Sequence, residues 1–137
     1  MIKLYQGDCL EIMPRLIEEG TKVDAIITDI PYFQIVDNKW DNQWRDINDY
    51  LGWCNSCFNR CYNVLKETGS ILIFTSRQNN RKICNELDKT FYEKRIIIWS
   101  RKRAFNNTRG NFYFTSTHIK YCLNLHSQIL KESIKFC

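Results

Sequence analysis

The chain has 137 residues, a formal net charge of +5, and 44% hydrophobic and 26% charged residues. This length fits one domain with a real core but is small for a complete cofactor-dependent enzyme. The composition is that of an ordinary globular protein. No apolar run reaches the length of a membrane span, and the N-terminus lacks the pattern of a secretory signal. We therefore expect a cytoplasmic protein whose seven cysteines are reduced thiols.

The first part of the chain predicts a strand, a helix and a second strand. Ile2–Tyr5 alternates like a short strand, and Asp8 is a natural N-cap for a helix over Cys9–Glu19. Gly20 should close this helix. Val23–Thr28 is an apolar, β-branched run typical of a buried strand. Two strands joined in this way should be parallel.

Helices and strands continue to alternate after this unit. The expected elements are a loop from Phe33 to Arg45, a helix from Asp46 to about Lys66 that stops at Gly69, a strand Ser70–Thr75, a helix Asn79–Lys89, a strand Lys94–Ser100, a basic loop over 101–111, and a strand near Ile119–Leu125. Such alternation predicts an α/β fold with a doubly wound sheet.

Three cysteines of the long helix invite comparison with a zinc site. Cys54, Cys57 and Cys61 share one helix face, and no second Cys/His pair is arranged to complete a metal site. We therefore interpret them as core thiols and expect no metal.

The tetrad Asp29-Ile30-Pro31-Tyr32 follows the second predicted strand directly. It places a carboxylate, a proline with fixed φ and an aromatic ring at the carboxyl end of the strand, where α/β sheets bind ligands. Taken alone, such a tetrad also fits an ordinary turn.

The order of motifs around the tetrad is more specific. Gly7-Asp8-Cys9-Leu10-Glu11 precedes it, and Asn38-Lys39-Trp40-Asp41, an aromatic-rich helix and Gly69-Ser70-Ile71-Leu72-Ile73-Phe74 follow it. Over about residues 2 to 118 this order resembles the N-terminal half of the permuted amino-group DNA methyltransferases of phages and restriction-modification systems. The resemblance implies a partial Rossmann-like methyltransferase sheet, mostly parallel, with helices on both faces and antiparallel strands near the C-terminal end.

The resemblance also implies the chemistry of the tetrad. An exocyclic base amine is a poor nucleophile because its lone pair is delocalised into the ring. Acceptance of its N–H bonds by the Asp29 carboxylate and the Ile30 carbonyl would aim that lone pair at an incoming methyl group. Pro31 would fix the turn, and Tyr32 would stack on a base flipped out of the duplex. Asp29 favours adenine N6 over cytosine N4 as the target, and an asparagine there would have favoured a protein amide.

The implied methyl donor is S-adenosylmethionine, with Asp8, Cys9, Asp29 and Pro31 as the candidate residues that hold it. The implied partner is DNA. From Lys94 to Lys131 the chain has eight Lys and Arg residues and no acid, and such a segment can contact phosphates. The candidate nucleic-acid contacts are Tyr32, Trp40, Arg101, Lys102, Arg103 and Arg109.

One expected element is missing. The five glycines, Gly7, Gly20, Gly52, Gly69 and Gly110, supply no glycine-rich turn for the methionine end of the cofactor. We therefore expect a truncated enzyme, with residues 1–126 as the catalytic part and 127–137 as a poorly defined tail. A homodimer or a complementary C-terminal half could complete the cofactor pocket. The alternative is an inactive remnant or subunit that binds nucleic acid or pairs with the missing half.

Overall fold

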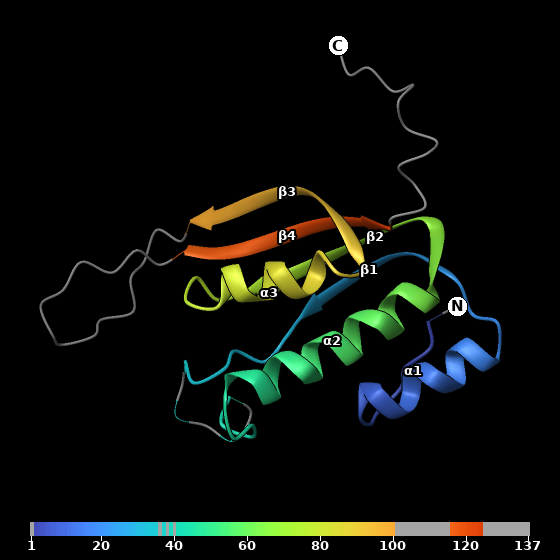
Figure 1. Cartoon of the computed structure of the whole chain (residues 1–137). Helices are drawn as coiled ribbons and strands as arrows, with labels where there is room; N and C mark the ends of the chain where they lie inside the picture. The colour runs from blue at the N-terminus through green and yellow to red at the C-terminus, as the bar shows by residue number, and fades with distance from the viewer. Residues whose placement is uncertain (1, 36, 38, 40, 101–115, 125–137) are drawn as a thin grey trace, which may run out of the picture.

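The structure is a computed structural model that describes residues 2–35, 37, 39, 41–100 and 116–124 (Figure 1). The predicted tail over 127–137 lies outside these residues. Three helices and four strands are described, namely α1 (Cys9–Glu18), β1 (Val23–Asp29), α2 (Ile47–Val64), β2 (Leu65–Thr75), α3 (Asn80–Leu87), β3 (Phe91–Ser100) and β4 (Ser116–Asn124). Within the described part, no helix is long and apolar enough to cross a membrane.

The four strands form one mixed sheet in the order β1-β2-β4-β3. β1 and β2 are parallel, whereas β4 is antiparallel to both of its neighbours, β2 and β3. β1, β2 and β3 therefore run in the same direction, and their carboxyl ends meet at one edge of the sheet. The predicted α/β fold with an antiparallel strand near the C-terminal end is confirmed.

The three helices lie side by side on one face of the sheet, with α2 between α1 and α3 (Figure 1). Helices on both faces were expected, so this expectation is not met within the described residues. On β1, Ile26 packs against the core, so the next residue, Ile27, faces the other side of the sheet. Its side chain is 71% exposed. The described part of the chain thus covers only one face of its sheet.

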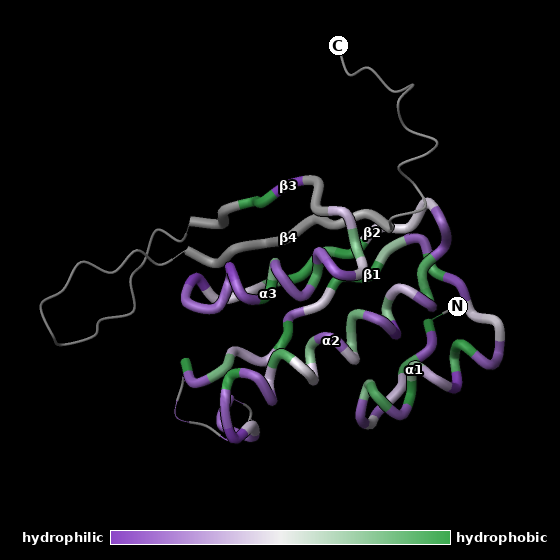
Figure 2. Tube along the Cα trace, in the orientation of Figure 1, coloured by the Kyte–Doolittle hydropathy of each residue, from purple (hydrophilic) through white to green (hydrophobic). Residues whose placement is uncertain are grey.

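The core lies between α2 and β2. Hydrophobic and hydrophilic residues alternate along α2 (Figure 2), as a helix with one buried face requires. Its buried face includes Tyr50, Phe58 and the three predicted core thiols, and it packs with Ile71 and Ile73 of β2 in one hydrophobic cluster. The prediction that these cysteines are core residues is confirmed.

The local signals at three helix ends are confirmed. The Asp8 carboxylate accepts from the N–H of Leu10 at 2.7 Å, and Asp46 caps α2 in the same way. Gly20 has a φ of 70° at the end of α1, a left-handed conformation that glycine adopts without steric cost.

The expected strand at Ile2–Tyr5 is wrong. These residues have no strand partner in the described part of the chain, and Leu4 is 92% exposed. An alternating sequence forms a strand only where a neighbouring backbone supplies hydrogen bonds. The expected parallel pair around α1 is therefore absent from the described residues.

The end of α2 also differs from the prediction. The helix ends at Val64 and β2 begins at Leu65, so Gly69 lies inside the strand and is not the helix stop. The register of β2 against β1 shifts across residues 66–69. A Cβ on Gly69 would lie 2.8 Å from the Lys66 carbonyl oxygen. A glycine at this position therefore lets the backbone of residue 69 lie close to that of residue 66.

Candidate functional site

The tetrad lies at the carboxyl end of β1. Asp29 is the last residue of the strand and pairs in register with Phe74 of β2. The Asp29 side chain is exposed, whereas Ile30 is buried and belongs to the core. The chain therefore leaves the sheet with a carboxylate in solvent and an apolar anchor directly behind it.

Asp29 and Tyr32 contact each other. The Tyr32 hydroxyl donates a hydrogen bond to Oδ1 of Asp29 at 2.8 Å. The two residues are three positions apart, so the turn through Ile30 and Pro31 folds the ring back over the end of the strand. This geometry places a hydrogen-bond acceptor and an aromatic ring at one point.

Three side chains form hydrogen bonds with the backbone that directly follows β1. The Tyr50 hydroxyl donates to the Pro31 carbonyl at 2.7 Å, and the Tyr32 N–H donates to the Asp41 carboxylate at 2.9 Å. The Asn79 amide donates to the Phe33 carbonyl at 3.1 Å. We call Tyr50, Asp41 and Asn79 the backbone clamp.

The clamp was not predicted from the sequence. Its members come from α2, from the loop after the tetrad and from the turn before α3, and each bonds a different one of three consecutive residues. In the sequence, Asp41 stands out only as the last residue of the motif over 38–41. Its burial in a polar loop, where it is 6% exposed, is the property that identifies it, because a buried carboxylate needs hydrogen-bond donors.

Aromatic rings support the clamp from behind. Tyr50 stacks on Phe33 at 5.5 Å between centroids and meets Trp44 edge-on at 4.8 Å. Burial, followed by the neighbouring Cys54, raises the pKa of Tyr50 far above its ordinary value. The hydroxyl therefore remains protonated and available as a donor to Pro31.

The four predicted cofactor residues come together. Asp8, Cys9, Asp29 and Pro31 line one hollow of about 650 Å³ between α1, β1 and α2, together with apolar side chains such as Trp53. A volume of this size suits a small-molecule ligand, as does an apolar wall with a few polar groups. Asp8 and Asp29 lie far apart in the sequence, yet both belong to this wall.

The predicted nucleic-acid contacts divide into two groups. Tyr32 lies at the site, whereas Trp40, Arg101, Lys102, Arg103 and Arg109 lie outside the described residues. The strands before and after the basic loop are described. β3 ends at Ser100 and β4 begins at Ser116, and because β3 runs parallel to β1, the chain enters this loop at the edge of the sheet that carries the tetrad.

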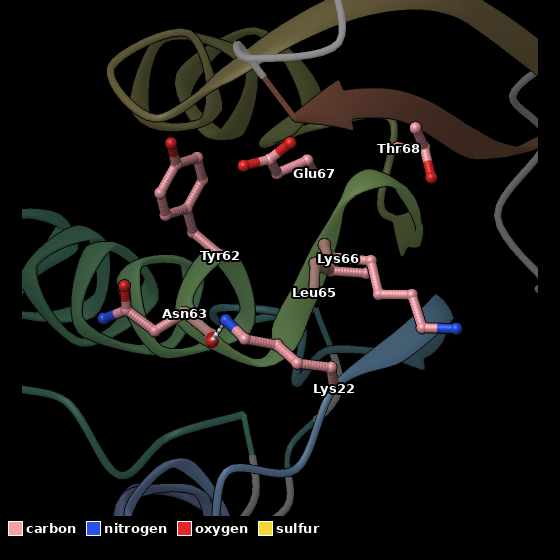
Figure 3. A pocket seen from close by; sticks show the side chains of 7 residues that line it. All are labelled: Lys22, Tyr62, Asn63, Leu65, Lys66, Glu67 and Thr68. Carbon is pink, nitrogen blue, oxygen red and sulfur yellow. Dashed lines mark hydrogen bonds between the residues drawn. The ribbon is translucent and has the colours of Figure 1, made fainter.

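A second hollow, of about 550 Å³, lies at the opposite end of β1 (Figure 3). Its lysines are engaged, since Lys22 donates to the Asn63 carbonyl at 2.7 Å and Lys66 pairs with Asp24 at 2.8 Å. It lies at the amino ends of the parallel strands, where α/β sheets do not ordinarily bind ligands. The hollow beside the tetrad is therefore the better candidate site.

A family model of DNA methylases (N6_N4_Mtase) matches residues 23–130, which is most of the chain. The chain belongs to this DNA methylase family. The resemblance carried by the tetrad and its flanking motifs is thereby confirmed.

Curated relatives agree with the family. The chain is 28% identical to the type II methyltransferase M.HinfI of Haemophilus influenzae over 124 residues, which cover 78% of the chain and 33% of that protein. It is 33% identical to M.BamHI of Bacillus amyloliquefaciens over 90 residues, which cover 64% of the chain and 20% of that protein. The chain thus corresponds to a third or less of either relative's length.

Solved structures agree with the fold. A crystal structure of the M1.HpyAVI–SAM complex superposes with a TM-score of 0.66 at 24% identity, covering 90% of this chain and 54% of that one. TTHA0409 of Thermus thermophilus, complexed with S-adenosyl-L-methionine, gives a TM-score of 0.60 at 16% identity, covering 86% and 51%. The predicted Rossmann-like methyltransferase fold is confirmed.

Proposed function

We propose that this chain carries the catalytic tetrad of an S-adenosylmethionine-dependent DNA methyltransferase that acts on an exocyclic base amine. One observation carries the proposal. The Asp29–Tyr32 pair is held by the backbone clamp at the carboxyl end of β1, beside a hollow lined by all four candidate cofactor residues.

The tetrad suits activation of an amine. The Asp29 carboxylate already accepts an O–H donor from Tyr32, and in the complex it would accept an N–H of the target amine instead. The Ile30 carbonyl would accept the second N–H. Release of the Tyr32 hydroxyl from Asp29 would free its ring to stack on the flipped base. Adenine N6 is our first choice of target, with cytosine N4 as the second.

The cofactor residues fit their role in part. The hollow offers the Asp8 and Asp29 carboxylates and an apolar wall, which suit the polar and aromatic parts of S-adenosylmethionine. That cofactor supplies a methyl group on a sulfonium. The chain's own contribution is to align the amine and to place negative charge next to it. None of the five glycines belongs to a glycine-rich turn of the kind that would approach the methionine end of the cofactor.

A partner would complete this pocket. Among the described residues, β1 has a neighbouring strand on one side only, and Ile27 is largely exposed on the face that the described helices do not cover. An unpaired edge next to an apolar face invites another chain. We propose a complementary C-terminal half, or a second copy of this chain, at this edge, with residues 1–126 as the catalytic part of a cytoplasmic enzyme. DNA contacts are assigned to Tyr32, Trp40 and the basic loop.

Labelled methyl transfer from S-adenosylmethionine to mixed-sequence duplex DNA tests the proposal. We expect incorporation by the purified chain where a second copy completes the pocket, or on addition of the complementary C-terminal half. In either case incorporation should be lost in Asp29→Ala and unchanged in Tyr92→Phe, an exposed tyrosine on β3. Chromatography of the nucleosides then separates N6-methyladenine from N4-methylcytosine. A folded chain that binds DNA but transfers no methyl even with the complementary half present would favour the inactive subunit, which the comparisons do not favour.

A further inference from the structure

Two cysteines contact each other in the wall of the hollow beside the tetrad, which we call the cofactor hollow. Sγ of Cys9, in the first turn of α1, lies 3.7 Å from Sγ of Cys57 in the middle of α2. Both residues line the hollow that also contains Asp8 and Asp29. They are 48 positions apart in the sequence, so only the packing of α1 on α2 brings them together.

The two thiols have different environments. Cys9 is partly exposed, whereas Cys57 is buried in the core. The Cys57 S–H group lowers the pKa of Cys9 to about 7, against smaller opposing effects of burial and of the Asp8 carboxylate. The same contact, together with burial, raises the pKa of Cys57. Cys9 is thus the more accessible and the more acidic of the two thiols, and Cys57 is the protonated partner beside it.

We propose that Cys9 and Cys57 form a reversible disulfide under peroxide and thereby make the cofactor hollow sensitive to oxidation. The sulfur atoms need to approach from 3.7 Å to about 2.05 Å. This approach requires a change of side-chain rotamer together with a small shift of α1.

The reaction balances with hydrogen peroxide as the oxidant. The Cys9 thiolate attacks one peroxide oxygen and the O–O bond breaks, which leaves a sulfenic acid on Cys9 and releases hydroxide. The Cys57 sulfur then attacks the Cys9 sulfur. The S–O bond breaks, the S–S bond forms, and the departing hydroxide leaves as water with the Cys57 proton. Each peroxide is reduced to water while two thiols become one disulfide.

The consequence for ligand binding rests on the proposed function. The disulfide would draw the first turn of α1 against α2 and narrow the hollow next to Asp8. Displacements of about 1 Å at a binding site have large effects on its function. We expect S-adenosylmethionine to bind about tenfold more weakly to the oxidised chain.

Peptide mapping tests the disulfide without any ligand. After peroxide treatment and alkylation of the remaining thiols, we expect a cross-linked peptide pair that contains Cys9 and Cys57 and that dithiothreitol separates. The pair should be absent from Cys9→Ser and from Cys57→Ala. The first variant changes a partly exposed residue and the second a buried one, so a folding defect in one does not affect the test in the other. It should persist in Cys84→Ser, because the Cys84 thiol donates to the Asn80 carbonyl and not to another thiol.

Calorimetry with S-adenosylmethionine tests the consequence. The affinity of the chain should fall on oxidation and return with dithiothreitol, whereas peroxide should not change the affinity of Cys9→Ser, which lacks the thiolate that peroxide attacks. Recovery of Cys9 as a free thiol, or in a cross-link to another cysteine, overturns the proposal. A cross-link without a change in affinity overturns its effect on binding. If the reduced chain binds no cofactor even with its partner present, the proposed function fails, while the mapping result still decides the disulfide.

Discussion

The contact between Tyr50 and Pro31 allows a stringent test of the backbone clamp. Tyr50→Phe removes one hydroxyl and keeps the ring that stacks on Phe33 and meets Trp44. The lost hydrogen bond is 2.7 Å long, and Tyr50 is 1% exposed. The change therefore isolates the clamp from the aromatic cluster behind it.

The expected cost follows from what is left behind. A typical internal hydrogen bond contributes about 1 kcal/mol net, and a buried carbonyl left without a donor costs about 1 to 3 kcal/mol. The hydrogen bond to the Pro31 carbonyl is only partly buried, so we expect Tyr50→Phe to lower the free energy of unfolding by about 1 kcal/mol. In urea titrations followed by tryptophan fluorescence, the midpoint should fall while the m-value is unchanged.

Tyr92→Phe is the matched control. Tyr92 is an exposed tyrosine, and surface changes of this kind usually stay within about 0.5 kcal/mol. If Tyr50→Phe costs no more than Tyr92→Phe, the hydroxyl does not hold the turn after the tetrad, and our account of how the site is positioned is wrong.

Further predictions concern the caps, the glycines and the buried thiols. Asp8→Ala removes the N-cap of α1 and should cost about 1 kcal/mol in chemical denaturation; no change would contradict the cap. Gly69→Ala should destabilise by about 1 to 3 kcal/mol, because the new Cβ meets backbone at 2.8 Å. Gly52→Ala, with open space around it in α2, should stabilise by about 1 kcal/mol; equal effects at the two glycines would refute this reasoning. Burial raises the pKa of Cys54 and of Cys61 from 9.0 to about 12. Between these values the unfolded chain loses thiol protons that the folded chain keeps. The free energy of unfolding should therefore fall as the pH rises above 9, by up to about 1.4 kcal/mol per pH unit for each thiol, and Tm should fall with it. The fall should be shallower in Cys61→Ala.

Much of the fold was predictable because its signals are local. Each of these signals involves residues that are close in the sequence: the N-caps Asp8 and Asp46 bond to N–H groups two or three residues away, and Gly20 ends the helix just before it. The apolar stripe of α2 is likewise a property of the helix period. The tetrad was predictable for the same reason, since its four residues are contiguous and the strand before them has a clear pattern.

Other features could not be read from neighbouring residues. Ile2–Tyr5 has the pattern of a strand, but strand formation depends on a partner strand, which no pattern within these four residues specifies. The glycine at position 69 predicted a helix end that lies too late. Leu65 pairs with Val23 of β1, so the strand begins there and α2 ends at Val64.

The sequence alone thus determined the helices, most strands and the position of the tetrad, because side-chain period, caps and turn residues act over short distances. The tertiary structure decided how the site is held and what lies around it. The backbone of three consecutive residues is bonded by side chains from separate parts of the chain, namely Asp41, Tyr50 and Asn79. Likewise, Cys9 of α1 contacts Cys57 of α2. These contacts depend on the packing of distant segments, and no local pattern specifies that packing.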